Sequence, residues 1–409
     1  MKTIVHPEDR LRLLLAHKNR KMAVSAHAYV RGSTRRFYEW LNQADHAEIP
    51  AGPPVWICGD CHIGNLGPVG SGGGGLAIQI RDLDQAVIGN PAHDLIRLGL
   101  SLAMAARSSD LPGVVTALMM EKMVDGYTSA FLLDATDDAE DVPVPKTVAG
   151  AMHAAARRSW KHLADERIEG EAVLPLGSRF WPLSQDERQE VEEFFSDEKI
   201  RRLAASLRES GDPDHIPDHI SVKDAAYWRK GCSSLGRLRV AVLLQIGKGK
   251  ERRYCLMDVK EAARAAAPTD PSADMPSDDG ERVCQGALAL SPYLGRRMAS
   301  GRLLGRAVFV RELLPQDLKL EIDTLSQEEA VSVAEFLAYI VGRAHARQLD
   351  AAARSRWIAE LGRSNGSPLE APIWLWNAVV ELVSIHEAAY LEHCRRFALK
   401  LERPDEVVG

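Results

Sequence analysis

Residues 58–67, which read CGDCHIGNLG, combine two sets of side chains that could do chemistry. Cys58 and Cys61 have the C-x-x-C spacing of a zinc knuckle or a dithiol redox site. Asp60 and Asn65 place a carboxylate and an amide five positions apart, which suits a proton acceptor and a metal ligand on one loop. The two patterns point to different functions, so the rest of the chain must decide between them.

The six cysteines, at positions 58, 61, 232, 255, 284 and 394, are scattered through 409 residues. The first 21 residues lack the long apolar run of a secretory signal, so reduced thiols are expected rather than a disulfide framework. A structural zinc also needs a second ligand pair, and none stands nearby at a suitable spacing; His62 alone cannot complete a tetrahedron. We therefore favour Asp60 and Asn65 as the functional pair, with a zinc or redox site as the alternative.

Phosphoryl transfer requires a carboxylate that orients the attacking hydroxyl, oxygen ligands for Mg²⁺ and a cation on the nucleotide phosphates. Asp60 is the candidate for the carboxylate, and its spacing from Asn65 is the D-x-x-x-x-N spacing of a kinase catalytic loop. Asn65 and Asp82 are the candidate Mg²⁺ ligands, and Asp84 is either a further metal ligand or an exposed acid. Lys260, at the end of an expected strand, is the candidate cation.

A glycine- and serine-containing loop comes before the strands that lead to Lys260. The strands are expected at 238–246 and 252–260, with the polar turn GKGKE between them. A loop followed one hairpin later by a lysine is the arrangement of a phosphate-covering loop and a phosphate-binding lysine in protein-kinase-like folds. The loop residues expected to bind the nucleotide are Gly231, Ser233, Ser234 and Gly236.

Two spatial expectations follow for a bound nucleotide. Residues 308–315, VFVRELLP, should form a strand that leads into a hinge, so that adenine lies against backbone groups from Glu312 to Leu314. The nucleotide and its Mg²⁺ should also bridge Lys260 and Asp82, which puts the lysine nitrogen and the carboxylate within roughly 10 Å of each other in a closed, ligand-bound state, with a longer distance in an open one.

The elements around the loop are expected to be mainly helical. Two short apolar strands, 54–60 and 76–84, interrupt the helices and could form a hairpin joined by a connector that includes GSGGGG. Asp94 is expected to be a structural acid at the start of the following helix. His345, near the end of a helix that begins with a Ser326–Glu329 capping box, is expected to be a hydrogen-bonded packing residue.

Composition limits the class of protein. The chain is 45% hydrophobic and has a formal net charge of -6, so it can bury a large core and gives no general reason to expect a nucleic-acid partner. No window approaches the length of a membrane span, and the cytoplasm is the expected location. The oligomeric state is left open by the sequence.

The segments GDCHIGNLG and IRDLDQAVIGNPAHDLIRLGLSLA resemble the catalytic segment of aminoglycoside and choline kinases. The match is closer to the DUF2252 family, to which KMAVSAHAYVRGSTRRFYEWL and GCSSLGRLRVAVLLQI are also similar, from about Lys21 to Phe397. This resemblance implies an α+β, circularly permuted protein-kinase-like fold, because the catalytic loop comes before the glycine loop in the chain. It implies a large helical lobe from 1–215 and 321–409 and a small β-rich nucleotide-binding lobe from 216–320.

The resemblance also implies an ATP-dependent kinase that uses Mg²⁺ and transfers the γ-phosphate to a hydroxyl. The acceptor is expected to be a small molecule, with a peptide as the other possibility. Two further hypotheses remain: a nucleotide-binding pseudokinase that regulates a partner, and a kinase-like fold that transfers a nucleotide. One departure concerns Gln285, which stands where an acid facing Lys260 is expected; Glu281, one turn earlier, is the candidate substitute.

Overall fold

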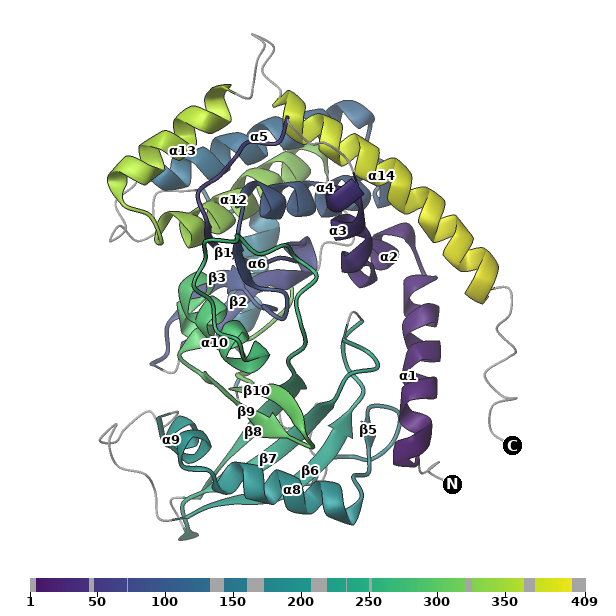
Figure 1. The fold of residues 1–409 in the computed structure, drawn as a ribbon, viewed down its shortest axis with the longest axis vertical. Coiled ribbons are helices and arrows are strands. Elements are labelled where there is room, and N and C mark those ends of the chain that lie inside the picture. Colours follow the sequence, from purple (N-terminus) through teal and green to yellow (C-terminus); the bar gives the residue numbers. More distant parts are fainter. Residues whose placement is uncertain are drawn as a thin grey trace.

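The strands of the chain form one large antiparallel sheet and two small ones, arranged below and within a group of helices (Figure 1). The computed structural model describes residues 5–43, 48–71, 73–132, 143–159, 173–206, 219–232, 234–249, 252–320, 326–363 and 372–398. The architecture is α+β, as the sequence predicted. No helix in these ranges is both long enough and apolar enough to cross a membrane.

The large sheet has six strands in the order β5-β6-β7-β8-β10-β9, and every neighbouring pair is antiparallel. The strands are β5 (Phe180–Trp181), β6 (Ile220–Trp228), β7 (Arg239–Ile246), β8 (Arg253–Glu261), β9 (Met298–Leu303) and β10 (Arg306–Glu312). Alternate residues of β7 face opposite sides of the sheet, and both sides are buried.

Two helices cover one face of this sheet, α8 (Gln185–Ser196) and α9 (Glu198–Ser206). Phe194 and Phe195 of α8 share a buried core with Val240 and Val242 of β7. Because β5 pairs with β6 and α8 packs on the sheet, the sheet and its covering helices begin near residue 180, earlier than the expected boundary at 215. Helix α1 (Pro7–Met22) also packs there, and its Leu14 lies in the same core.

The two small sheets correct one prediction. Strand β1 (Val55–Ile57) pairs with β4 (Val87–Gly89), while β3 (Leu76–Ile80) pairs with β2 (Leu66–Gly70). The expected hairpin between 54–60 and 76–84 is therefore wrong. Strand β2 was missed because its sequence, LGPVG, is buried along its whole length and carries two glycines and a proline, which are depleted in strands. The glycine-rich turn instead closes the β2–β3 hairpin, where Ser71 N donates to Gly75 O at 2.7 Å.

The helical part is built around α4 (Ala92–Ser108), α5 (Gly113–Leu132) and α12 (Gln327–Ala346), which share one large core. Helices α5 and α12 approach closely at glycines: a Cβ on Gly126 would lie 2.2 Å from Glu335 O, and one on Gly342 would lie 2.6 Å from Tyr127 O. The remaining elements are α2 (Ala26–Gly32), α3 (Thr34–Gln43), the 3₁₀ turn Ile63–Asn65, α6 (Lys146–Ala156), α11 (Pro292–Gly295), α13 (Ala351–Arg363), α14 (Ile373–His393) and the π-helical turn Cys394–Ala398.

Helix α10 (Asp279–Leu290) lies between the large sheet and the helical part (Figure 1). Its Val283 packs against Phe309 of β10, and Gly286 lies close to Trp56 of β1 and to Ala86. The helix therefore connects β10, the strand paired with β8 and its Lys260, to the segment that carries Asp82 and Asp84. These contacts bring the two halves of the expected site together.

Candidate functional site

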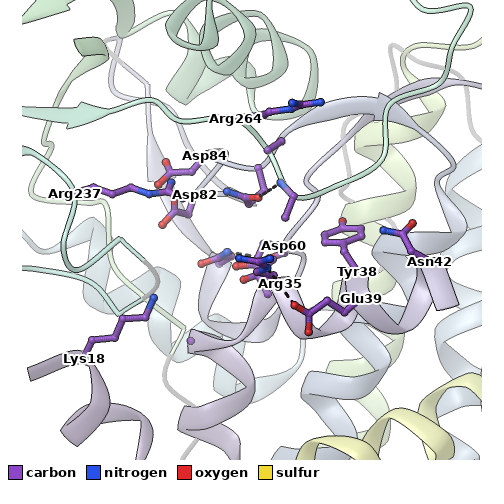
Figure 2. Close-up of a pocket in the computed structure, with 16 residues that line it drawn as sticks. Lys18, Arg35, Tyr38, Glu39, Asn42, Asp60, Asp82, Asp84, Arg237 and Arg264 are labelled. Atoms are coloured by element: carbon purple, nitrogen blue, oxygen red, sulfur yellow. Dashed lines mark hydrogen bonds and ion pairs between the residues drawn. The ribbon is translucent and has the colours of Figure 1, made fainter. Parts of the chain in front are cut away.

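A cavity of about 650 Å³ is lined by the candidate catalytic and metal-binding residues Asp60, Asn65, Asp82 and Asp84. We call it the Asp60 cavity. Its walls come from α1, the α2–α3 junction, the loop after β1, the β3–β4 connection, the β6–β7 loop and the segment after β8. In Figure 2, Asp60 lies near the centre, with Lys18 and Arg237 to one side and Tyr38, Glu39 and Asn42 to the other.

The loop that carries Asp60 is held by a carboxylate from the start of α4. Asp94, fully buried, accepts hydrogen bonds from Cys58 N at 2.7 Å and from Gly59 N at 3.0 Å. His345 of α12 contacts the same carboxylate, with Nε2 3.2 Å from Asp94 Oδ2, and its Nδ1 is 2.9 Å from Tyr127 Oη. Asp94 and His345 therefore have the structural placements that the sequence predicted, and they fix the backbone on which Asp60 stands.

Gly59 allows the sharp turn just before Asp60. Its φ is +70°, and a Cβ there would lie 2.2 Å from Gln85 O. The β3–β4 connection therefore presses directly on the loop. Any larger residue at position 59 would push the two segments apart, because the opposing atom belongs to the backbone.

Asp60 is paired with an arginine that sequence reasoning missed. Arg97 of α4 donates from Nε to Asp60 Oδ1 at 2.9 Å, and its Nη2 donates to Val30 O at 2.7 Å. Burial raises the pKa of Asp60 above its ordinary value, although Arg97 and the Thr34 hydroxyl oppose this effect. The available signal was a charged residue inside an apolar helix, between Ile96 and Leu98.

Asp82 and Asp84 meet Lys260 across the boundary between the large sheet and the helical part. The lysine Nζ lies 3.0 Å from Asp82 Oδ1 and 2.8 Å from Asp84 Oδ1. The expectation that Lys260 and Asp82 would come within roughly 10 Å is confirmed. Sequence separation is large, 178 positions for one pair, so only the folded chain creates this cluster.

The two carboxylates differ in their titration. Burial would raise the pKa of Asp82, but the Lys260 ammonium and other neighbours hold it well below its ordinary value. Burial and the negative charge of Asp82 raise the pKa of Asp84 to about 6. One lysine therefore does not neutralise both acids, and the cluster has an excess of negative charge.

A second ion cluster lies beside Lys260 on the same face of β8. Asp258 Oδ1 and Oδ2 accept from Arg239 Nε and Nη2, at 2.8 and 2.5 Å. Arg311 of β10 contributes two longer contacts to Asp258, at 3.4 Å, and donates from Nη1 to Arg81 O at 2.8 Å. Together with Trp228 and Leu256, these side chains fill the face of the sheet next to Lys260.

Helix α10 was expected to provide an acidic partner for Lys260, but its inward-facing charged residue is Arg282. Glu281 and Gln285 are both exposed, and among the described residues Lys260 forms its side-chain bonds with Asp82 and Asp84 instead. The expectation that Glu281 would pair with Lys260 is wrong. Arg282 is the buried residue of this turn, and it donates to Ala86 O, to Asp84 O at 3.2 Å and to Ala263 O at 2.9 Å. The acid partners of Lys260 come from the β3–β4 connection instead.

The glycine loop closes against α1. Gly231 and Gly236 both have positive φ, +97° and +100°, which favours glycine at these positions. Lys21 Nζ donates to Gly231 O at 3.0 Å, so the helix and the loop are joined. Arg237 lines the Asp60 cavity, whereas Gly231, Ser234 and Gly236 do not; Ser233 lies outside the described residues.

Glu312 and Leu314 do not join the Asp60 cavity. Both line a second cavity, of about 730 Å³, that shares no lining residue with the first. The backbone groups expected to bind adenine already have partners: Leu313 N donates to Leu256 O at 2.9 Å, and Leu314 N to Asp317 Oδ2 at 3.3 Å. The structure therefore places the expected adenine-binding backbone apart from Asp60, with its donors used internally.

The sequence matches the DUF2252 family, described as an uncharacterized protein conserved in bacteria, over residues 10–396. The chain belongs to the DUF2252 family. No curated protein and no solved structure matches it significantly. The resemblance to this family that the motifs indicated is thus confirmed over almost the whole chain.

In this DUF2252 protein the C-x-x-C pair lies in the core. Cys58 and Cys61 are fully buried and carry free thiols, and Cys58 Sγ lies 3.5 Å from Asp82 O. A hydrogen bond with Cys61, burial and the nearby Asp94 carboxylate raise the pKa of the Cys58 thiol well above its ordinary value. The described residues contain no group of three or more His, Cys, Asp or Glu side chains suited to hold a metal ion.

Several cavity residues of the DUF2252 chain carried no recognisable motif. Lys18 comes from α1, Arg237 follows the glycine loop, and Arg264 follows β8. Each stands in a segment rich in other charges, so its residue type alone did not distinguish it from a solvated surface residue. Their common feature is spatial, because three segments that are distant in the chain each contribute a cationic residue to the lining of the same cavity, with Lys18 and Arg237 on the side of Asp82 (Figure 2).

Proposed function

We propose that this DUF2252 protein is an ATP-dependent phosphotransferase that moves the γ-phosphate to a hydroxyl group. The observation that carries the proposal is the meeting of Asp60, Asn65, Asp82 and Asp84 in one cavity, with Lys260 bonded to two of the acids. A proton acceptor, oxygen ligands and a phosphate-binding cation are the groups that phosphoryl transfer requires.

The order of elements in the sheet supports a kinase-like arrangement. The glycine loop joins β6 to β7, Lys260 stands near the end of the third strand of this run, and α10 follows. Kinases likewise place a glycine-rich loop before a strand lysine and follow it with a helix. Here those elements come after the Asp60 loop in the chain, so we propose a circular permutation of that fold.

Asp60 is proposed to accept the proton of the acceptor hydroxyl. As the hydroxyl oxygen bonds to the γ-phosphorus, the bond from that phosphorus to the β–γ bridging oxygen breaks, and ADP leaves. The pKa of Asp60, raised by burial, makes its carboxylate a better proton acceptor than an exposed aspartate. Arg97 holds the carboxylate in place through its bond to Oδ1.

The residues present fit a magnesium ion. Asp82 and Asp84 supply carboxylate oxygens with an excess of negative charge, and Asn65 uses its amide nitrogen on Asp60 O at 2.9 Å, which leaves its amide oxygen available. Mg²⁺ is commonly held by one or two carboxylates together with substrate phosphates, so a cage of three protein acids is not needed. When bound, the ion would neutralise developing charge on the phosphate oxygens.

The cations around the cavity suit a chain of phosphates. Lys18 and Arg237 line the side next to Asp82, and burial lowers the pKa of Lys18 from its ordinary value. With Mg²⁺ bound to Asp82 and Asp84, their negative charge would be neutralised by the metal. Lys260 would then be able to bind phosphate oxygens in place of the two carboxylates. On the other side of Asp60, Tyr38, Glu39 and Asn42 are placed to contact a small acceptor molecule (Figure 2).

Product analysis with the Asp60→Asn variant tests the proposal. With γ-labelled ATP, Mg²⁺ and a panel of metabolites, antibiotics and peptides, the wild-type protein should form ADP and a labelled acceptor. Asp60→Asn should keep nucleotide affinity but lower turnover by roughly a hundredfold or more, because the general base is lost. Asp125→Asn, a change at an exposed Asp125–Lys122 pair, is the matched control and should behave as wild type.

Other outcomes of the product analysis would favour one of the two alternative functions. Pyrophosphate with a nucleotide-labelled acceptor would indicate nucleotide transfer, and nucleotide binding without any product would indicate a pseudokinase. Turnover by Asp60→Asn at the wild-type rate would show that Asp60 is not the base.

A further inference from the structure

The second cavity, lined by Glu312, is well formed and has no role in the proposed phosphotransfer. We call it the Glu312 cavity. At about 730 Å³ it falls within the range of small-molecule sites. Four segments line it: the β2–β3 turn, the end of α6, the ends of β7 and β8, and the loop that follows β10.

Glu312 is a buried charged residue of this cavity whose carboxylate has no partner among the described residues. This residue is only 9% exposed, and its carboxylate makes no hydrogen bond or ion pair with the other described residues. Arg297, the nearest candidate, donates instead to the Glu312 backbone oxygen and to Asp317. Burial raises the pKa of Glu312 to about 7, with Arg297 opposing and Asp317 adding to the rise. The carboxylate oxygens face the cavity without a donor from the part of the chain that the structure describes, so a ligand that supplies donors can bind them.

The residues that line the cavity and its opening indicate which other chemical groups a ligand would carry. Ile246, Leu314 and Pro315 provide apolar surface beside the carboxylate. Arg252 and Arg253 are exposed at the start of β8, and neither forms an ion pair with a carboxylate of the described residues. Their guanidinium groups can bind an anion at the opening of the cavity.

The sheet register sets the separation between these two features. Glu312 is the cross-strand partner of Met257 on β8, and Arg253 is four residues before Met257 on the same face. At about 3.4 Å per residue this places Arg253 roughly 13 Å along the strand from Glu312. The arginine side chain shortens this span, which leaves room for a ligand of the size of an amino acid or a nucleoside monophosphate.

We propose that the Glu312 cavity binds a small molecule with a guanidine-type pair of N–H donors at one end and an anionic group at the other. A carboxylate accepts such a pair in two parallel hydrogen bonds, which is the geometry of arginine–carboxylate pairs. The same donor pair occurs on the edge of a guanine base and in the side chain of arginine. The ligand is therefore either a guanine nucleotide or an arginine-like amino acid, and it binds at a site separate from Asp60.

Calorimetric titration of the full chain tests this with four probes, GMP and L-arginine and their matched controls AMP and L-norleucine. AMP keeps the phosphate but lacks the paired donors, and L-norleucine keeps the amino-acid end but has an apolar side chain. We expect either GMP or L-arginine to bind with Kd below about 1 mM, and its control to bind at least tenfold more weakly. The probe that binds identifies the source of the ligand.

Glu312→Gln should weaken that binding at least tenfold, while Glu281→Gln, at an exposed residue of α10, should leave it unchanged. The double change Arg252→Ala with Arg253→Ala should weaken binding severalfold and provides a second variant at exposed positions if Glu312→Gln does not fold. The proposal is overturned if neither GMP nor L-arginine binds below about 1 mM. It is also overturned if the folded Glu312→Gln variant, or the rim variant in its place, keeps the wild-type affinity. Asp60→Asn should not alter this binding, so the outcome is independent of the phosphotransfer proposal.

Discussion

Two ion clusters stand two residues apart on the same face of β8, and they are built in opposite ways. In the Asp258 cluster, one carboxylate is shared by two guanidinium groups, those of Arg239 and Arg311. In the Lys260 cluster, one ammonium is shared by two carboxylates, those of Asp82 and Asp84. The first has more positive than negative charge, and the second has the reverse.

Their exposure differs as well. The Asp258 side chain is fully buried, and its arginines hold the pKa well below its ordinary value against the effect of burial. The Asp82 side chain is 36% exposed and opens into the Asp60 cavity. A closed cluster with satisfied charges serves to hold strands together, whereas an open one with excess negative charge is suited to take up a cation. The comparison teaches that neighbouring buried charges on one strand can have separate roles.

The largest effect is expected from breaking the closed cluster. Asp258→Asn leaves two buried guanidinium groups without a carboxylate, so the free energy of unfolding should fall by about 3–5 kcal/mol. Urea unfolding followed by circular dichroism measures this. Asp125→Asn, at an exposed ion pair, should cost less than about 1 kcal/mol. A wild-type unfolding midpoint for Asp258→Asn would mean that the cluster does not stabilise the sheet.

A smaller effect is expected from opening the other cluster. Lys260→Met removes the cation proposed to exchange carboxylates for phosphate oxygens, so affinity for Mg²⁺–ATP should fall by about 10- to 100-fold. Stability should change less than in Asp258→Asn, because Asp82 and Asp84 reach the cavity and can take up a proton. Calorimetric titration with Mg²⁺–ATP measures the affinity, and Lys122→Met, at the exposed Asp125 pair, is the control. Unchanged affinity would contradict the phosphate-binding role.

The smallest effect concerns the third member of the closed cluster. Arg311→Met keeps the two short bonds between Arg239 and Asp258 and removes only the contacts at 3.4 Å and the bond to Arg81 O. The free energy of unfolding should therefore fall by only about 1 kcal/mol. Urea unfolding of Arg311→Met and Asp258→Asn side by side measures the two losses in the free energy of unfolding. A loss as large as that of Asp258→Asn would contradict this, because it would mean that the longer Arg311 contacts matter as much as the whole cluster.

Short sequence patterns predicted much of the candidate site. The spacing of Asp60 and Asn65 lies within one loop, and the glycine positions 231 and 236 have the positive φ that such a loop needs. The capping box at Ser326 and the placement of Asp94 at a helix start were likewise readable, because each depends on residues a few positions apart. Family membership also followed from these short motifs.

Other features could not be predicted from the sequence, mostly because the residues that interact lie far apart in the chain. Strand β2 is the exception, because its partner β3 is the next strand in the chain and β2 was missed only for the weak strand propensity of its glycines and proline. The carboxylate partners of Lys260 lie 178 and 176 positions away, and Glu281 was preferred only because it stands on the expected helix. The adenine assignment to Glu312–Leu314 assumed free backbone donors, which the fold uses in hydrogen bonds to Leu256 and Asp317.

The sequence by itself determined the family, the α+β class and the candidate acids, because these depend on residue type and short spacing. Tertiary structure alone decided which charges meet: Arg97 with Asp60, and Lys260 with Asp82 and Asp84. The physical reason is that a charge acts over a few ångströms through space, and only the packing of strands and helices brings distant residues that close.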